Sequence, residues 1–290
     1  MKGPLAAFII RFFAALPMPV AQALGWLLGR LLYWLPNNSQ RQTRLNIERC
    51  FPQLTSRQQS QLVQQSLVHT SMAMMEMGHN WCANPDQQRR RIKAVKGAEL
   101  LSAEASVGRI VLTPHFGNWE LFASWLAQQT ALTALYKPAK LAQLDKLIAD
   151  GRQAAGMALA PASAKGVMTL KRALKKQQSI LILPDQEPPK QSAVKVTFFS
   201  QPAYTMTLAS QLAQAGKDGQ APQVLLGWAK RLGVGKGFAI ELLDVTDALG
   251  QDDIEASVQA MNDAIASLVA QEPAQYQWEY RRFKQTLEAS

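Results

Sequence analysis

The pattern of apolar and polar positions along the chain changes near Pro85. Before it, the chain is almost continuously apolar over residues 4–35 and has a helical pattern over residues 39–83. After it, short apolar runs alternate with amphipathic stretches, which predicts strands that alternate with helices. The predicted strands cover 110–113, 132–136, 157–160, 179–183, 224–229 and 238–243, and the predicted helices lie near 118–129, 141–153, 164–177, 204–216 and 253–271. This alternation predicts an α/β fold with a mainly parallel central sheet flanked by helices.

Two local signals predict how elements begin and connect. Residues 55–58 read Thr-Ser-Arg-Gln, a capping-box pattern that predicts a long helix from this point to about Trp81. A glycine-rich turn at residues 233–237 joins the last two predicted strands, which favours an antiparallel hairpin. Neither its glycine spacing nor the hairpin context matches a phosphate-binding loop.

The apolar N-terminus predicts contact with a membrane. Arg11 and Arg30 enclose 18 uncharged residues, which is near the lower limit for a bilayer span. Pro17 and Pro19 interrupt this stretch and argue equally for two short helices that dip into one leaflet. A buried pair of core helices is the alternative. We expect residues 1–35 to be a membrane anchor or a pair of interfacial helices.

The rest of the chain is expected to form a second unit over residues 36–290, helical over 36–84 and α/β over 85–290. Positive charge follows the apolar segment, at Arg30, Arg41, Arg44 and Arg49. Such an excess of cations stays on the cytoplasmic side of a membrane. We therefore expect the protein at the cytoplasmic face of a membrane.

The composition narrows the partners further. A formal net charge of +10 implies an acidic partner, such as an anionic bilayer, an acidic protein or nucleic acid. No nucleic-acid-binding motif accompanies the charge, so we expect no nucleic-acid partner. Cys50 and Cys82 form no C-x-x-C motif and no zinc-like spacing with the 3 histidines, which argues against a disulfide scaffold and a structural metal.

The strongest candidate chemistry is the pair His115 and Glu120, directly after a predicted strand. A separation of five residues does not place two side chains together on one helix. It can do so if the strand ends near His115, the chain turns at Gly117 and a helix starts near Asn118. Glu120 would then lie in the first helical turn and could reach back to the imidazole. A histidine base oriented by a carboxylate is what removal of a proton from a hydroxyl requires.

Other polar residues fall at the same edge of the predicted sheet, where ligands bind in open α/β folds. Lys137 follows the second predicted strand, Asp185 follows the fourth, and Arg152 ends the helix before the third. Each also has a simpler explanation, because aspartate is a common turn residue and isolated cations are usually solvated. Their convergence with His115 favours one polar site.

Taken together, these residues resemble the bacterial lipid A late acyltransferases, the lauroyl/myristoyl group of the lysophospholipid acyltransferase superfamily. The segment His115–Glu120 is similar to the H-x4-D/E motif of that superfamily. Further similar blocks follow in order at 41–52 (RQTRLNIERCFP), 136–138 (YKP), 151–152 (GR), 183–186 (LPDQ), 198–199 (FF) and 278–284 (WEYRRFK). A lone H-x4-E occurs often by chance, whereas the ordered set covers nearly the whole chain.

The chain also departs from the family pattern. The asparagine usual after the Tyr-Lys-Pro step is absent from residues 139–141, and Ser192-Ala193 and Ser200 stand where the family has glycines. None of these departures touches His115 or Glu120. They bear on the acceptor, because the affected loop is expected to border the acceptor site.

The resemblance implies an O-acyltransferase that moves a fatty acyl chain from acyl carrier protein to a hydroxyl of a lipid A precursor, without a metal or cofactor. In this interpretation His115 deprotonates the hydroxyl, and Glu120 holds the imidazole and stabilises its cationic form. The backbone N–H groups near Gly117 and Asn118 would receive the developing oxyanion.

The resemblance also implies that Arg152, with Lys137 as the weaker candidate, holds a phosphate of the acceptor lipid, and that Asp185 pairs with one of these cations. Two alternatives remain at this stage. The first keeps the chemistry but acylates a phospholipid, an ornithine lipid or another glycolipid. The second is a membrane-associated lipid-binding protein without catalysis.

Overall fold

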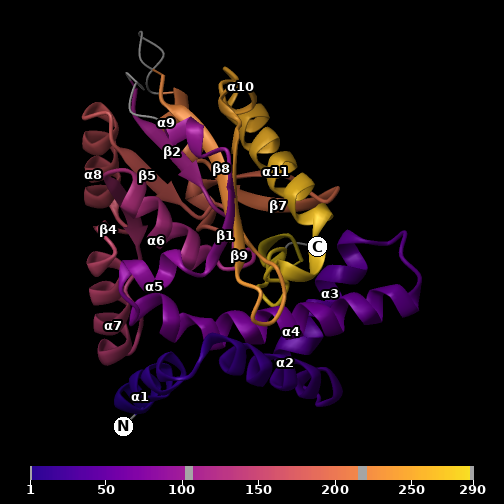
Figure 1. Ribbon diagram of the computed structural model, residues 1–290. Coiled ribbons are helices and arrows are strands. Elements are labelled where there is room, and N and C mark those ends of the chain that lie inside the picture. The colour runs from indigo at the N-terminus through magenta and orange to yellow at the C-terminus, as the bar shows by residue number, and fades with distance from the viewer. Residues whose placement is uncertain (1, 102–106, 215–220, 288–290) are drawn as a thin grey trace.

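A computed structural model describes residues 2–101, 107–214 and 221–287 (Figure 1). Its centre is a seven-stranded sheet with the order β1-β9-β8-β2-β5-β3-β4. Only the β8–β9 pair is antiparallel, so the prediction of a mainly parallel sheet with a late hairpin is confirmed. The strands are β1 (Ile92–Lys96), β2 (Arg109–Leu112), β3 (Leu132–Tyr136), β4 (Met157–Pro161), β5 (Ser179–Ile182), β8 (Gln223–Arg231) and β9 (Phe238–Asp244).

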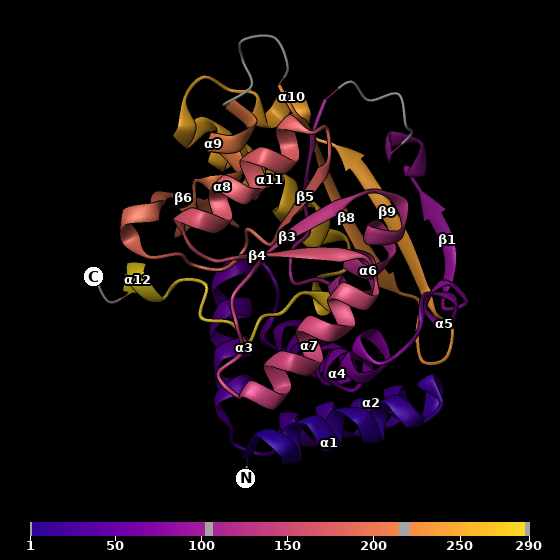
Figure 2. The same ribbon diagram turned by 90° about the vertical axis from the view of Figure 1, so that its left-hand side faces the viewer.

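Helices cover both faces of the sheet, because neighbouring residues of β2 and β5 point to opposite sides and both sides are apolar. Val111 and Leu181 pack against α6 (Trp119–Gln129) on one face. Ile110 and Ile180 belong to a larger cluster on the other face. That face carries α8 (Ala164–Lys175), α9 (Leu208–Gln214) and α11 (Ile254–Gln271), while α7 (Ala142–Ala154) lies beyond the β4 edge (Figure 2). Shorter helices are α5 (Pro85–Arg89), α10 (Thr246–Leu249) and α12 (Lys284–Leu287).

The sequence pattern missed three strands. β1 is a short edge strand with four of its five residues exposed, and its sequence IKAVK does not alternate regularly between apolar and polar residues. The strands β6 (Ala193–Phe198) and β7 (Gln201–Met206) form a separate antiparallel hairpin. The helix predicted over 204–216 begins only at Leu208, because residues 204–206 pair within this hairpin.

The N-terminal apolar segment forms two helices, α1 (Lys2–Ala15) and α2 (Met18–Trp34), separated at the first proline. In Figure 1 they lie below the long helix α4 (Ser56–Trp81), which starts at the predicted capping box. The helix α3 (Asn38–Cys50) connects α2 to α4. None of the described helices combines the length and the hydropathy that a bilayer span requires.

One face of α2 packs tightly against α4. Its buried residues are small or polar, and a Cβ atom on Gly25 would lie 2.7 Å from the Cα of Met72. A glycine pair at positions 25 and 29 therefore allows the two helix backbones to approach closely. The expected alternative of buried core helices thus describes one face of α2, whereas its other face is exposed.

Candidate active site

Register within the sheet brings His115 and Asp185 together. β2 and β5 are parallel neighbours in which Leu112 pairs with Ile182, and each of the two polar residues follows its strand by three positions. The Asp185 carboxylate contacts His115 twice. Its Oδ1 lies 2.8 Å from the imidazole Nδ1, and its Oδ2 accepts the backbone N–H of His115 at 2.8 Å.

This pairing corrects the expected partner of the imidazole, which is Asp185 and not Glu120. Glu120 lies in the first turn of α6, but its side chain faces α4 and α7 instead of the imidazole. Its Oε1 accepts from Arg152 Nη2 at 2.5 Å, and its Oε2 accepts from Arg152 Nε at 3.2 Å and from Trp81 Nε1 at 2.9 Å. The expectation that Asp185 pairs with Arg152 or Lys137 is therefore also wrong. Asp185 pairs with His115, and Glu120 pairs with Arg152.

The two carboxylates and the imidazole form an electrostatically coupled group. Burial lowers the pKa of His115, but the adjacent Asp185 carboxylate, with smaller contributions from Glu120 and Glu279, raises it, and the net pKa is raised. Burial opposes ionisation of Glu120, yet Arg152 and the Trp81 indole hold its pKa below the usual range. Both carboxylates are therefore ionised at neutral pH.

The second imidazole nitrogen, Nε2, faces Gln186 and not Asp185. An ionised Asp185 can only accept, so His115 Nδ1 carries the proton and Nε2 keeps a lone pair. Gln186 Nε2 lies 3.3 Å from that nitrogen, and the Trp119 ring contacts the imidazole edge-on with centroids 5.2 Å apart. The His115 side chain is 17% exposed whereas that of Asp185 is 3% exposed, so the base is reachable and its orienting group is not.

A tyrosine that the sequence analysis did not select supports Asp185. The Tyr276 phenol is buried and forms a hydrogen bond with the Asp185 carboxylate, and both burial and this carboxylate raise its pKa well above the usual value. The residue reaches the site because Phe116 and Tyr276 form an isolated antiparallel bridge. Its distance in sequence from the motif left no local signal.

The backbone at Gly117 and Asn118 cannot receive an oxyanion, which corrects a second expectation. The Gly117 N–H donates to Gln275 O and the Asn118 N–H donates to Ala229 O, each at 2.9 Å. The Asn118 bond forms because β8 runs past the end of β2 and bridges to Gly117, whereas the Gly117 bond goes to the C-terminal part of the chain. Gly117 has a φ of 59°, and a Cβ at this position would fall on the Ala229 carbonyl oxygen, so glycine is required here.

The Asn118 side chain is likewise occupied within the protein. Its Oδ1 caps α6 by accepting from Leu121 N at 2.9 Å and also accepts from Asn80 Nδ2 at 2.8 Å. Its Nδ2 donates to Glu76 Oε2 at 3.0 Å. Asn118 therefore positions the motif and is not placed to contact a substrate, contrary to the expected binding role.

Glu76 belongs to a buried ion pair that the sequence analysis did not find. Arg231 donates to both its carboxylate oxygens, at 2.7 and 2.6 Å, and both side chains are fully buried. Arg231 Nη2 also reaches Gly117 O at 3.3 Å, and Gln22 Nε2 of α2 donates to Glu76 Oε1 at 2.7 Å. A chain of polar contacts thus connects α2 to the loop that carries His115.

The remaining predicted site residue, Lys137, lies exposed after β3, and no polar contact between described residues involves it. Within the described ranges, no group of three or more His, Cys, Asp or Glu side chains could hold a metal ion.

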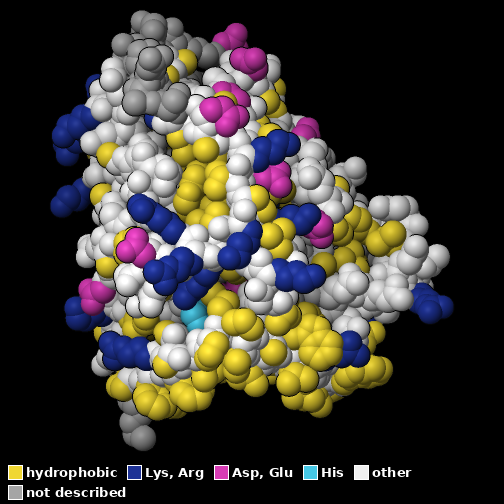
Figure 3. Space-filling view, in the orientation of Figure 1, with side chains coloured by type: hydrophobic (Ala, Val, Ile, Leu, Met, Phe, Trp, Pro, Cys, Tyr) yellow, Lys and Arg dark blue, Asp and Glu magenta, His cyan; other side chains and the backbone are white. Residues whose placement is uncertain are grey.

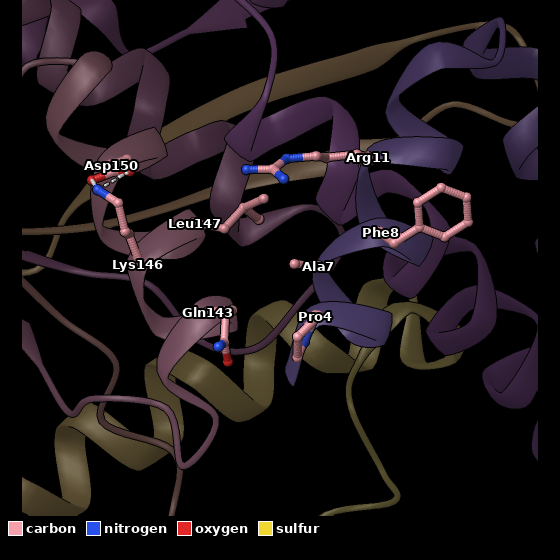
Figure 4. A pocket seen from close by; sticks show the side chains of 8 residues that line it. All are labelled: Pro4, Ala7, Phe8, Arg11, Gln143, Lys146, Leu147 and Asp150. Atoms are coloured by element: carbon pink, nitrogen blue, oxygen red, sulfur yellow. Dashed lines mark hydrogen bonds and ion pairs between the residues drawn. The ribbon is translucent and has the colours of Figure 1, made fainter. Parts of the chain in front are cut away.

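A separate cavity of about 270 Å³ lies between α1 and α7 (Figure 4). Phe8 and Arg11 extend from α1, and the Lys146–Asp150 ion pair lies on α7, with 2.9 Å between Nζ and Oδ2. Its lining holds no histidine, and its one carboxylate is already paired with Lys146. This cavity is therefore not a candidate for proton transfer.

An imidazole held by a buried carboxylate at the carboxyl edge of a mainly parallel sheet is typical of α/β enzymes that use acid–base chemistry. Comparison with known proteins identifies the family. The model for bacterial lipid A biosynthesis acyltransferases matches residues 4–285, so the chain belongs to this family and is an enzyme that transfers acyl groups.

Related proteins align with this chain over most of their length. The chain is 28% identical to a lipid A biosynthesis lauroyltransferase of Escherichia coli (strain K12), over 93% of this chain and 87% of that protein. It is 26% identical to a lipid A biosynthesis acyltransferase of Haemophilus influenzae, over 97% and 89%. It is 23% identical to a lipid A biosynthesis palmitoleoyltransferase of E. coli K12, over 95% and 89%.

Proposed function

We propose that the protein transfers a fatty acyl chain from the thioester of acyl carrier protein to a hydroxyl of a lipid A precursor, at the cytoplasmic face of the inner membrane. The observation that carries this proposal is the His115–Asp185 pair, with its partly exposed imidazole, in a chain of the lipid A acyltransferase family. The relatives' names give the acceptor class, and the basic net charge suits an acidic carrier protein.

In this mechanism the imidazole moves one proton in two steps. His115 Nε2 removes the proton from the acceptor hydroxyl while the oxygen forms a C–O bond to the thioester carbonyl carbon. The tetrahedral intermediate then breaks its C–S bond, and the imidazolium returns the same proton to the leaving thiolate. Asp185 stabilises the transient imidazolium, and no external acid, base or oxidant is needed.

Glu120 has an indirect part in this mechanism. It binds the Nε and Nη2 edge of Arg152, whose side chain remains 20% exposed. The Nη1 nitrogen is left for a substrate oxygen. Glu120 is then a positioning residue for Arg152, and it also contributes to the raised pKa of His115.

We also propose that α1 and α2 attach the protein to the membrane surface. Figure 3 shows hydrophobic side chains gathered over these helices, with Lys and Arg side chains scattered above them. The exposed apolar residues are Leu5, Phe8, Ile9 and Phe12 on α1 and Val20, Leu24, Trp26, Leu27, Leu31 and Trp34 on α2. An apolar face bordered by cations is the pattern of a protein that lies in the interface of an anionic bilayer.

The chemistry is tested with purified protein, acyl carrier protein loaded with a fatty acid, and a lipid A precursor. His115→Ala should lower kcat at least about 100-fold, the lower end of what a positioned base contributes. Its melting temperature should fall, because the buried Asp185 carboxylate loses its imidazole partner, so kcat is compared at a temperature at which the variant is still folded. Transfer that survives this substitution would refute the base assignment.

The same assay separates the alternatives. A wild type that acylates phospholipid, ornithine lipid or another glycolipid in preference to the lipid A precursor would change the acceptor and keep the chemistry. Tight lipid binding without turnover, unaffected by His115→Ala, would indicate a non-catalytic binding protein.

Membrane attachment is tested by replacing Phe8, Phe12, Leu27 and Leu31 together with serine. These side chains are 51–66% exposed, so the change should leave the fold intact. At roughly 1 kcal/mol lost per side chain, the partition into anionic vesicles should fall about 100-fold or more. A matched control replaces Met168 and Val95, exposed apolar residues outside α1 and α2, and should sediment with vesicles as the wild type does.

A further inference from the structure

A basic cavity lies between α3 and the C-terminal segment, residues 278–284. Its volume is about 510 Å³, which is larger than one phosphate group requires and within the range of small-molecule sites. Four cations line it, namely Arg41 and Arg49 on α3 and Arg281 and Lys284 on the segment. Glu279 is the one carboxylate in this lining.

The walls of this cavity are fixed by buried contacts. The Asn46 amide, itself a lining residue 2% exposed, donates to both Trp278 O and Tyr280 O at 2.7 Å. These bonds tie α3 to the C-terminal segment. Arg49 lies over the Phe283 ring, with its guanidinium carbon 5.6 Å from the ring centroid, so one face of the guanidinium is packed while its N–H edge stays available.

Its arginines differ from Arg152 in their charge balance. Arg152 is neutralised by Glu120, whereas neither Arg41 nor Arg49 forms an ion pair with a carboxylate of the described residues. The lining holds four cations against one carboxylate, Glu279, so it keeps a net positive charge whichever protonation state Glu279 takes. The site therefore favours a multiply charged anion.

One lining residue of the cavity, Glu279, interacts electrostatically with His115. Gln277 N donates to His115 O at 3.0 Å, and Glu279 follows two residues later. Glu279 is close enough to His115 to raise its pKa, and Thr70 holds the Glu279 carboxylate at 3.0 Å. The C-terminal segment that forms one wall of the cavity is thus connected to the loop that carries His115.

The cavity also adjoins the exposed apolar surface. α3 begins at Asn38, a lining residue, three residues after Leu35, and Trp34 and Leu35 are 73% and 49% exposed. Leu45, also in the lining, is 48% exposed. Cations next to apolar side chains suit an anionic headgroup that carries acyl chains.

We infer that this cavity binds a phosphorylated sugar headgroup of the lipid acceptor, with Arg41 and Arg49 as its phosphate ligands, while Arg152 remains with Glu120. This inference rests on the proposed function, whose acceptor is a phosphorylated lipid. The phosphopantetheine of the donor offers the same chemistry, but the adjoining apolar surface favours the lipid.

The test compares two acceptors with identical acyl chains, a phosphorylated lipid A precursor and its dephosphorylated form. The double variant Arg41→Gln/Arg49→Gln should raise KM for the phosphorylated acceptor by about 30-fold or more, the scale of losing charge-assisted bonds to phosphate. KM for the dephosphorylated acceptor and for acyl carrier protein should not change. The matched control Lys171→Gln/Arg172→Gln removes two exposed cations from α8 and should leave all three values unchanged.

Several outcomes would overturn the inference. An unchanged KM for the phosphorylated acceptor would do so, and a KM that rises only for acyl carrier protein would assign the cavity to the donor. An equal effect of the control would indicate diffuse electrostatics. Should the double variant not fold, Arg41→Gln alone is used, because this side chain is exposed.

A binding measurement separates this inference from the proposed function. Vesicles that contain either acceptor are sedimented with the protein in the absence of donor. If the wild type does not transfer an acyl chain to the lipid A precursor, the proposed function is refuted. Phosphate-dependent binding that Arg41→Gln/Arg49→Gln abolishes would still support the assignment of the cavity as a phosphate site. Acyl transfer combined with binding that does not depend on the acceptor phosphate would refute this inference and leave the proposed function intact.

Discussion

Replacing Asp185 by asparagine should disable the imidazole through its tautomer. In the wild type, Oδ2 accepts the His115 backbone N–H and Oδ1 accepts the Nδ1–H. An asparagine that keeps the backbone bond must turn its NH₂ group toward Nδ1. It would donate to that nitrogen and so place the ring proton on Nε2, where the base needs a lone pair.

The size of the effect follows from the same geometry. The contact between Nδ1 and Oδ1 is 2.8 Å long, and the carboxylate is 3% exposed. Two charges at about 4 Å with an effective dielectric constant near 20 interact by about 4 kcal/mol, an upper bound of about 3 pKa units. Since Asp185 raises the pKa of His115, its removal should lower that pKa, by about 1–3 units.

The pH dependence of kcat/KM and the value of kcat report the two effects separately. The acid limb of the profile should move to lower pH, because the imidazole stays neutral further into acid. The value of kcat should fall by about 10²–10⁴, the range over which a wrongly protonated histidine fails as a base. Unchanged kcat, or an acid limb that moves to higher pH, would refute the role of Asp185.

Glu120→Gln is the informative comparison for this experiment. Glu120 influences the pKa of His115 less than Asp185 does, and it contacts Arg152 and Trp81 directly. The variant should lower kcat while moving the acid limb less than Asp185→Asn does. A larger displacement than in Asp185→Asn would return Glu120 to the role of the carboxylate that orients the base.

Two further predictions concern residues that support the site. Gly117→Ala should destabilise the fold by at least about 1 kcal/mol in urea unfolding and should lower kcat, because the positive φ and the Ala229 carbonyl both oppose a side chain there. An unchanged unfolding midpoint would contradict this close approach of the Ala229 carbonyl to Gly117. Glu76→Gln should lower the free energy of unfolding by about 3–5 kcal/mol, because it leaves Arg231 buried without its counter-ion. In a double-mutant cycle, Glu76→Gln/Arg231→Met should recover part of this stability. Strictly additive losses of stability would refute the coupling of Glu76 to Arg231.

The sequence predicted the strands that carry the site more accurately than the contacts within it. Apolar runs located β2 and β5, and each candidate residue was placed at the end of its strand. Which carboxylate meets His115 depends on strand order, since Asp185 reaches it only because β5 is the direct neighbour of β2 in matched register. The hydrophobic periodicity of a sequence predicts where strands lie but not the order in which they neighbour one another in the sheet.

The oxyanion expectation failed for a related reason. A turn followed by a helix start does leave backbone N–H groups without helical partners. Here β8 extends past the end of β2, and Ala229 takes the Asn118 N–H. The length of a strand more than a hundred residues away thus decided whether the Asn118 N–H was available, and Gln275 O takes the Gly117 N–H.

The contacts of α2 make removal of residues 1–35 a test of folding more than of membrane attachment. Gln22 donates to Glu76 and accepts from Gly235 N at 2.7 Å, so deletion leaves both groups without these partners. Each such loss costs about 1–3 kcal/mol, and the α4 surface beneath Gly25 and Gly29 would be exposed as well. The truncated protein should therefore lose acyl transfer even in detergent, with a lowered melting temperature, whereas the four serine substitutions on the outer face of α1 and α2 should retain it there. Full activity of the truncated protein in detergent would show that the polar contacts from α2 to the catalytic loop contribute nothing to the site.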